Sequence, residues 1–196
     1  MILPIVAYGN PVLKKKAKEV PKDLINFDEF IENMWETMYN AKGVGLAAPQ
    51  VGISSRIFIV DTSPFADSEN MNDDEFKLVD SFKKIFINPI IIEESGNEWN
   101  FNEGCLSIPE IRADIKRRDT VRIKYFDQEF REHHDTFFGI IARVVQHEYD
   151  HIEGVLFIDK LTPLKRKLIK GKLLNISKGK VETDYKMKFS KPIKNR

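Results

Sequence analysis

The sequence predicts a single domain of 196 residues that combines helices with short strands. Three observations lead to this prediction. Apolar residues recur at helical spacing in three segments, short β-branched or aromatic runs lie between those segments, and turn-forming residues separate the runs. Hydrophobic residues make up 42% of the chain and charged residues 31%, which is typical of globular proteins. No apolar run reaches about 18 residues, so we expect no transmembrane helix and no membrane partner.

The N-terminal segment and the single cysteine restrict the compartment in which the protein is expected. Residues 1–9 lack the basic start and the long apolar region of a signal peptide, so we expect a cytoplasmic location. Residues 4–21 are interpreted as an irregular arm with a turn at 9–11. Cys105 has no second cysteine to pair with. A lone cysteine is most often a small core residue, and its other roles are nucleophile and metal ligand.

In the first half of the chain, helical spacing predicts a helix over residues 28–41, with Asp28 as its N-cap and Gly43 as its stop. Two glycines and a proline make 43–50 a loop whose backbone can approach a ligand closely. That loop lacks the spacing and the lysine of a phosphate-binding loop. The apolar residues that define the helix are Phe30, Ile31, Met34, Trp35 and Met38.

Strands and a long acidic segment are predicted next. Residues 56–61 and 85–92 have strand composition, and Pro89 indicates an edge or a bulge in the second of these strands. Residues 64–82 are interpreted as an acidic surface loop with room for a short helix. Gly96-Asn97 is then expected to turn the chain.

The second half is predicted to begin with a hairpin of residues 121–126 and 130–134 around Asp127-Gln128. A mostly apolar helix follows over residues 136–151, with Gly154 near its end. The last expected elements are a short strand over 155–158, a basic amphipathic helix over 163–178 and a terminal strand over 185–189.

Charge is distributed unevenly along the chain. From Lys160 to Arg196 there are 13 Lys or Arg residues against two acids, which gives +11, whereas residues 1–159 sum to −10. This split predicts a basic tail that meets an anionic surface. A solvated helix followed by a free end explains the same composition equally well.

The segment 146–151 contains the pattern His-Glu-x-x-His, which is the strongest chemical signal in the sequence. His147 and His151 are four residues apart, so on a helix both imidazoles lie on one face and can bind one metal ion. Glu148 can then reach a metal-bound water without being a ligand. The helix before His147 is strongly apolar, and a metal would relieve the cost of burying two unpaired histidines there.

The third ligand of such a site is not evident downstream of the motif. Familiar zinc peptidases take a Glu or His from further along the chain. Here the nearest acids are Glu153 and Asp159, and Glu153 is poorly placed on the helix because it follows His151 by only two residues. Cys105, within the segment 103–109, is the only thiol available. A thiolate with two imidazoles suits iron(II), zinc or nickel and leaves a fourth position for water.

Three segments together resemble those of peptide deformylases of the bacterial type, in both order and spacing. They are Gly43-Val44-Gly45-Leu46-Ala47-Ala48-Pro49-Gln50, Glu103-Gly104-Cys105-Leu106-Ser107 and Gln146-His147-Glu148-Tyr149-Asp150-His151. The resemblance implies a catalytic domain over residues 1–165. It leaves 166–196 as a basic C-terminal extension that packs on, or trails, the same domain.

The resemblance implies an α+β fold with mainly antiparallel β-sheets packed around a central buried helix that carries the His-Glu-x-x-His motif. It implies removal of the formyl group from N-formylmethionyl nascent polypeptides, with release of formate. One divalent metal per chain is expected, with iron(II) in the cell and zinc, nickel or cobalt as alternatives in isolated protein. The implied metal ligands are Cys105, His147 and His151, the general acid/base is Glu148, and the oxyanion is held by the Gln50 side chain and the Leu106 N–H.

Elementary chemistry is consistent with these roles. A metal-bound water is the expected nucleophile, and Glu148 takes its proton before returning that proton to the leaving amine. The developing oxyanion is met by the metal, Gln50 and the Leu106 N–H. Cys105 is expected to act as a ligand, because a nucleophilic role would require a histidine base, and the motif histidines are better used on the metal.

Several neighbours have a functional and a structural interpretation. Gly45 is expected to offer backbone hydrogen bonds to the substrate, or else to be a turn residue with positive φ. Arg143 is expected to line the pocket rim with its stem while its charge reaches solvent. Arg112 is a candidate for binding the substrate peptide or for a surface role, and Glu103 and Asp150 are candidates for orienting the ligands. Apolar candidates for the methionine pocket, each of which could equally be ordinary core, are Val44, Leu46, Ile140 and Val144.

Two other functions remain open at this point. A zincin-type metallopeptidase would use the same motif, although its usual third ligand is absent downstream. A non-catalytic ribosome-binding or RNA-binding protein would explain the basic tail, although the catalytic set is complete. For an enzyme that acts on nascent chains, the tail suggests docking on ribosomal RNA. The residues expected to supply that contact are Lys165, Arg166, Lys167, Lys170 and Lys172.

Overall fold

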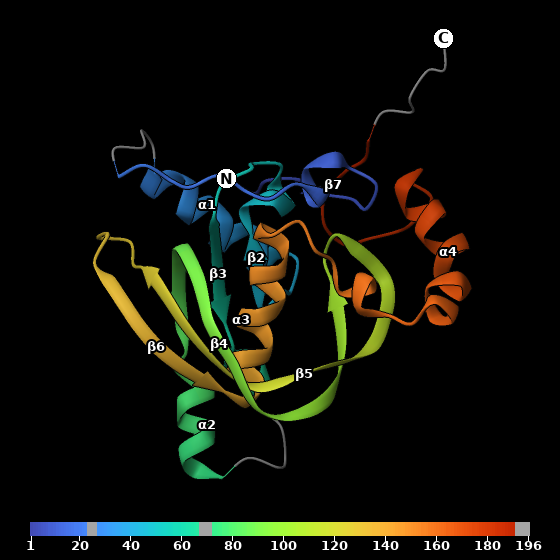
Figure 1. Cartoon of the computed structure of the whole chain (residues 1–196). Helices are drawn as coiled ribbons and strands as arrows, with labels where there is room; N and C mark the ends of the chain where they lie inside the picture. The colour runs from blue at the N-terminus through green and yellow to red at the C-terminus, as the bar shows by residue number, and fades with distance from the viewer. Residues whose placement is uncertain (23–26, 67–71, 191–196) are drawn as a thin grey trace.

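The computed structural model describes residues 1–22, 27–66 and 72–190, and it has an α+β fold with an antiparallel sheet and flanking helices (Figure 1). The sheet has five strands in the order β2-β3-β4-β5-β6, and each neighbouring pair is antiparallel. Its strands are β2 (Gly45–Ala47), β3 (Ile57–Asp61), β4 (Lys83–Cys105), β5 (Ile108–Phe126) and β6 (Glu132–Phe138). A separate parallel pair joins β1 (Ile5–Val6) to β7 (Met187–Lys188).

The helices lie on and around this sheet (Figure 1). The α-helices are α1 (Phe27–Asn40), α2 (Asp73–Asp80), α3 (Gly139–Ile152) and α4 (Pro163–Ser177). Short 3-10 helices are η1 (Pro11–Lys14), η2 (Ala48–Val51), η3 (Ser63–Phe65) and η4 (Phe157–Lys160). Among the described residues, none of the helices combines the length and apolar character needed to cross a membrane.

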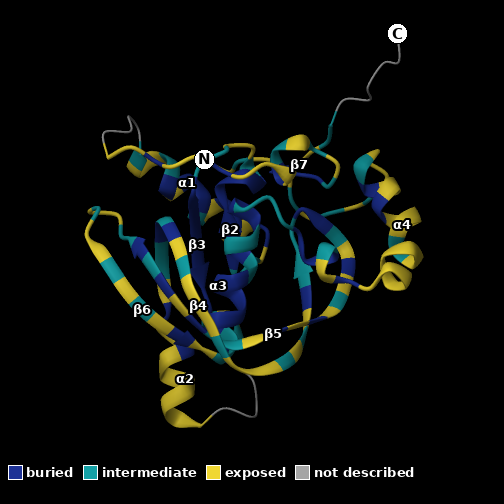
Figure 2. Ribbon diagram, viewed as in Figure 1, coloured by how far each residue is buried: buried dark blue, intermediate teal, exposed yellow. Residues whose placement is uncertain are grey.

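Helix α3 contributes nine buried residues to the interior, and Figure 2 shows most of its length as buried. Ala142 and Val145 belong to the same apolar cluster as Phe58 of β3, Phe86 of β4 and Val121 of β5. Burial of each large apolar side chain contributes about 1.5–3 kcal/mol. These contacts fix the orientation of α3, and its motif histidines face Glu103 and Cys105 at the end of β4.

The long β4–β5 hairpin brings Cys105 to α3. Its pairing register shifts at four places, so the hairpin bends and curls around instead of continuing as a flat ribbon (Figure 1). At one shift, Gly96 has φ +77°, and a Cβ on it would lie 1.9 Å from Asp119 Oδ1. Another shift falls around Asn88 and Pro89. The bulge expected from Pro89 is therefore confirmed, whereas the turn expected at Gly96-Asn97 is wrong because the strand continues through it.

The first and last strands of the chain, β1 and β7, lie side by side. After α4, the C-terminal segment returns to pair with β1 through β7 (Figure 1). Leu173 and Ile176 of α4 are buried in a second cluster with Ile108 and Ile115 of β5 and Phe157 of η4. A third cluster joins α1 to β2 and β3.

Most expected elements are confirmed within a few residues, including α1, β3, the β5–β6 hairpin, α4 and the terminal strand. The helix expected from residue 136 begins instead at Gly139, because Phe137 pairs with Val121 and extends β6. Asp28 is not an N-cap, since α1 begins at Phe27 and Asp28 lies within its first turn.

Two further expectations are corrected. Residues 43–50 are not simply a loop, because 45–47 pair with β3 and residues 48–51 form η2. Residues 155–158 do not form a strand, since η4 begins at 157 and the Leu156 N–H donates to the Asp159 carboxylate at 2.8 Å. The short helix expected within the acidic segment is confirmed as α2, and residues 67–71, which include Asp67 and Glu69, lie outside the described residues.

Candidate active site and metal centre

Three expected ligand side chains meet where the end of β4 reaches α3. Cys105 is the last residue of β4, and His147 and His151 lie one turn apart on α3. The Cys105 Sγ atom is 3.2 Å from His151 Nε2, and the ligand atoms of all three residues lie within 4.8 Å of one another. One thiolate and two imidazoles at this spacing fit a single divalent metal ion such as zinc or iron(II).

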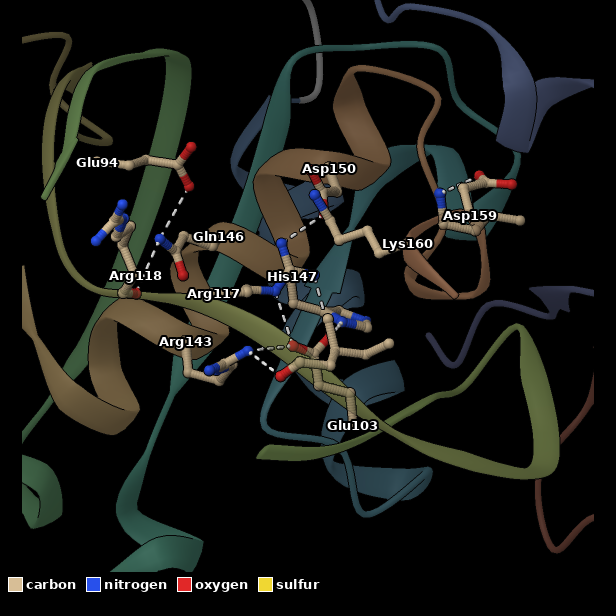
Figure 3. A network of polar contacts seen from close by, with 12 residues as sticks. Glu94, Glu103, Arg117, Arg118, Arg143, Gln146, His147, Asp150, Asp159 and Lys160 are labelled. Carbon is tan, nitrogen blue, oxygen red and sulfur yellow. Dashed lines mark hydrogen bonds and ion pairs between the residues drawn. The ribbon is translucent and has the colours of Figure 1, made fainter. Parts of the chain in front are cut away.

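The carboxylate of Glu103 lies next to these three side chains and is buried, with 4% of the residue exposed. It accepts hydrogen bonds from Arg117 Nε at 2.7 Å and Nη2 at 3.0 Å, and from Arg143 Nη1 at 2.9 Å (Figure 3). Its second oxygen lies 2.9 Å from His147 Nδ1. With Nδ1 donating to Glu103, His147 presents Nε2 to a metal, as is usual for a ligating histidine. The contact between Glu103 and His147 therefore supports the expectation that Glu103 orients a ligand.

The charges around Glu103 keep it ionised. Burial alone would raise the pKa of its carboxyl, but hydrogen bonds from His147 and Arg117 and their charges hold the pKa well below the usual range. Arg117 also donates to Asp150 at 2.7 Å, and burial is outweighed by these two acids, which raise the pKa of Arg117. Asp150 therefore contacts Glu103 only indirectly, through the Arg117 side chain that binds both carboxylates.

Glu148 occupies a different environment on the same helix. It is 4% exposed, and its Oε2 atom has no hydrogen-bond partner among the described residues. Burial raises the pKa of this carboxyl to about 7, and the charges of Glu103 and Asp150 act in the same direction, against those of His147 and Arg117. A buried carboxylate with a free oxygen and a pKa near neutrality is suited to exchanging protons with a reactant.

Gly45 allows Glu148 to occupy this position. A Cβ on Gly45 would lie 2.5 Å from Oε1 of Glu148 and 2.7 Å from its Cγ. Gly45 lies in β2 and is absent from the glycines with positive φ, so its interpretation as a turn residue is wrong. Glycine is required here because the backbone of β2 packs directly against the carboxylate.

Gln50 and Leu106 flank the same space. The Gln50 side chain is buried in η2, and its Oε1 accepts a hydrogen bond from the Ala47 N–H at 2.7 Å. This contact orients the amide so that Nε2 points toward Cys105 Sγ at 3.5 Å. Leu106 begins the two-residue turn that joins β4 to β5. Both groups thus lie beside the thiol of Cys105.

A cavity of about 880 Å³ opens onto these residues. Val44, Gly45, Val144 and Arg143 line it, in addition to Gln50, Cys105, Leu106, His147 and Glu148. Leu46 and Ile140 are not among the described residues that line it. Leu46 is fully buried between α1 and the sheet, and Ile140 packs against the α3 cluster.

Arg143 is arranged differently from its sequence-based expectation. Its side chain is 1% exposed, and its guanidinium donates to Glu103, to the Ile115 carbonyl at 3.0 Å and to the Trp99 carbonyl at 2.7 Å. The guanidinium also lies 4.5 Å from the Trp99 ring centroid. The expectation that its charge reaches solvent is wrong, because Glu103 compensates the charge inside the protein. Arg112, by contrast, donates to Asn102 Oδ1 at 2.8 Å on the cavity wall.

Comparisons with known proteins identify the family of this chain. A family model described as polypeptide deformylase matches residues 2–167. The chain belongs to the polypeptide deformylase family. A peptide deformylase of Christiangramia forsetii is 58% identical over 196 residues, which cover all of both chains. The crystal structure of the peptide deformylase from Thermus thermophilus has a TM-score of 0.78 and 34% identity, and it covers 91% of this chain and 99% of that chain.

A further solved relative is the Met-Ala-Ser-bound class I type b peptide deformylase from Acinetobacter baumannii. It has a TM-score of 0.72 and 32% identity, and the match covers 82% of this chain and 99% of that chain. This chain is thus a peptide deformylase by family, and its function is the hydrolytic removal of N-terminal formyl groups from nascent polypeptides. This family assignment contradicts the two alternative functions, a zincin-type metallopeptidase and a non-catalytic ribosome-binding or RNA-binding protein.

In this deformylase, part of the cavity wall comes from residues that carry no functional signal in the sequence. Glu182, Thr183, Asp184 and Tyr185 line the cavity although they follow the family match. The Tyr185 hydroxyl donates to the Leu106 carbonyl at 2.8 Å. The sequence signal in this region is the alternation of apolar and charged residues over 185–189, which predicts a strand but does not indicate its neighbours.

Proposed function

We propose that this deformylase acts through one divalent metal ion held by Cys105, His147 and His151. The observation that carries the proposal is the convergence of these three side chains beside the unpaired carboxylate of Glu148, at the wall of a substrate-sized cavity. We infer that iron(II) is the metal in the cell, and that zinc, nickel or cobalt can replace it in isolated protein. When bound, the ion would supply Lewis acidity, which polarises the formyl carbonyl and lowers the pKa of a water molecule.

The chain's own residues would divide the remaining work. Glu148 would take a proton from the attacking water and deliver it to the amine that leaves, so formate and a free methionyl terminus result. The Gln50 side-chain amide and the Leu106 N–H would donate to the oxyanion that develops on the formyl group. Glu103 would keep His147 in the required tautomer.

The substrate would be an N-formylmethionyl peptide lying along β2. We propose that Gly45 offers backbone hydrogen bonds to it and that Val44 and the stem of Arg143 line the methionine pocket. Leu46 and Ile140 would support that pocket from the core side. Binding of Met-Ala-Ser by the Acinetobacter baumannii relative supports a peptide that begins with methionine.

Formate release from formyl-Met-Ala-Ser tests the proposed chemistry, with an internal peptide bond as the competing substrate. Glu148→Ala should retain one metal ion per chain and lower turnover by about 10²–10⁴-fold. Glu98→Ala is a matched control, because Glu98 is an exposed partner of Lys116 in the β4–β5 hairpin. Unchanged turnover in Glu148→Ala would exclude Glu148 as the acid/base.

The basic extension provides a second, separate proposal. We propose that residues 1–165 supply the catalytic residues, and that the extension 166–196, which also adds residues 182–185 to the cavity wall, docks the enzyme on ribosomal RNA in the cytoplasm. The charged residues concerned are all exposed on α4, which supports the proposed docking. Residues 191–196 also belong to this extension but lie outside the described residues. The proposed contact residues are Lys165, Arg166, Lys167, Lys170 and Lys172.

Co-sedimentation with ribosomes at several salt concentrations tests this docking. The wild-type chain should sediment with ribosomes at low salt and be released steeply as salt increases. Replacement of Lys165, Lys167, Lys170 and Lys172 by glutamate should abolish sedimentation while formate release from a short peptide is retained. Equal binding by this variant and the wild type would refute the proposal.

A further inference from the structure

The C-terminal segment 181–190 lies beyond the family match, yet residues of this part of the chain line the catalytic cavity. Backbone hydrogen bonds hold it in place on the N-terminal arm. The Ile5 N–H donates to the Lys186 carbonyl at 2.8 Å, and the Ala7 N–H donates to the Lys188 carbonyl at 2.9 Å. The first of these bonds lies next to Tyr185, so its backbone has a fixed position relative to the core.

The side chains of this segment alternate between two environments. Tyr185, Met187 and Phe189 are half-buried, whereas Lys186 and Lys188 are exposed. Tyr185 packs in the same apolar cluster as Leu106. The alternation therefore directs the phenol of Tyr185 inward, toward the turn between β4 and β5.

That turn is held by two hydrogen bonds from outside the hairpin. The Tyr185 hydroxyl donates to the Leu106 carbonyl at 2.8 Å, and the Tyr8 N–H donates to the Ser107 carbonyl at 2.8 Å. The peptide planes on the two sides of Leu106 share its Cα atom. A bond that fixes the Leu106 carbonyl therefore restricts the direction of the Leu106 N–H.

We propose that Tyr185 is a positioning residue of the active site, which aims the Leu106 N–H at the oxyanion of the reaction. This inference rests on the proposed function, in which the Leu106 N–H is an oxyanion donor. Such a donor stabilises the transition state only when it lies about 2.7–3.1 Å from the developing charge. A displacement of about 1 Å can reduce the rate on the order of 10²-fold. The C-terminal segment is thus a working part of the catalytic cavity.

Tyr185→Phe tests the inference because it removes one oxygen atom and keeps the ring. Tyr39→Phe is the matched control, since it removes a phenol hydrogen bond to Asp61 at 2.6 Å, and Tyr39 does not line the cavity. We expect Tyr185→Phe to lower kcat for formyl-Met-Ala-Ser about tenfold, with KM within about twofold of wild type. Metal content and Tm should match those of Tyr39→Phe. Values of kcat that agree within about twofold for the two variants would overturn the proposal.

Amide NMR of the metal-loaded enzyme supplies a readout that does not depend on turnover. We expect the Leu106 and Ser107 amide signals to shift in Tyr185→Phe and to stay in place in Tyr39→Phe. Unmoved signals in both variants would overturn the positioning role. If the wild type released no formate while the Leu106 signal still shifted, the proposed function would fail and the contact between Tyr185 and the turn would stand.

Discussion

Replacement of Glu103 by glutamine should affect stability and metal binding through separate contacts. The carboxylate accepts four contacts, two from Arg117 and one each from Arg143 and His147. A glutamine amide is uncharged, and its NH₂ group cannot accept from an N–H donor. Arg117 would keep Asp150 as a partner, but Arg143 would be left 1% exposed with only carbonyl oxygens and aromatic rings around it.

The magnitude follows from this unpaired charge. Removal of one partner from a buried ion pair costs about 3–5 kcal/mol. For a chain of this size, each kcal/mol lowers Tm by about 2–4 °C, so we expect Tm of metal-free Glu103→Gln to fall by about 6–20 °C. Loss of the contact to His147 Nδ1 should also weaken metal affinity by about 10–100-fold.

A double variant separates the two effects. Adding Arg143→Met to Glu103→Gln removes the uncompensated charge, so part of the lost Tm should return. Metal affinity should stay low, because His147 still lacks its acceptor. Thermal unfolding of the metal-free proteins and competition with a chelator provide the two measurements. Recovery of metal affinity in the double variant, or a Tm of Glu103→Gln within about 2 °C of wild type, would refute this reasoning.

Three other predictions concern the same site. Gly45→Ala should lower kcat on the order of 10²-fold, because its Cβ displaces the Glu148 carboxylate, whereas Gly171→Ala, which has open space, should retain kcat in the same formate assay. The raised pKa of Glu148, about 7, means that the metal-free folded chain binds more protons than the unfolded chain above pH 4.5. Its free energy of unfolding should therefore fall by about 3 kcal/mol as pH rises from 4.5 to 7, and urea titrations of Glu148→Gln should lack this fall. Chelation of the metal should abolish formate release. Return of Ni²⁺ or Zn²⁺ at about pH 6.5 should restore formate release, and an indicator dye should detect protons released on metal binding. Restored activity without proton release would contradict the assigned ionisation states.

Local patterns were sufficient for the elements whose apolar residues are spaced regularly. Helix α4 and the β5–β6 hairpin follow from such spacing, and so does most of α3. The outer half of β4 was missed because residues 93–102 are mostly polar and mostly exposed, so no alternation marks them as a strand. That half is stabilised by pairing with β5 across the hairpin, and pairing of this kind leaves little signal in the sequence of one strand.

The same distinction applies to the site. His147, Glu148 and His151 follow from spacing on one helix, and Cys105 follows because the chain contains no other thiol. The environment of Arg143 depends on Glu103, which is 40 residues away in the sequence. The contact between Tyr185 and Leu106 spans 79 residues. Neither of these long-range contacts could be inferred from local residues, because each depends on how the curled hairpin meets the rest of the fold.

The buried charges around the site have a simple balance. Glu103 and Asp150 offset the buried Arg117 and Arg143, and Asp150 also pairs with the partly exposed Lys160 at 3.2 Å. The remaining groups are the Cys105 thiol and the Glu148 carboxyl, which together carry two negative charges when both are ionised. A divalent cation would neutralise them, whereas without it desolvation opposes ionisation of the buried Glu148 carboxyl. Burial correspondingly raises the pKa of Glu148 to about 7 in the metal-free chain. Under the proposed mechanism, burial thus holds the pKa of the base Glu148 near neutrality, and the supporting ion pairs fix the geometry of the site.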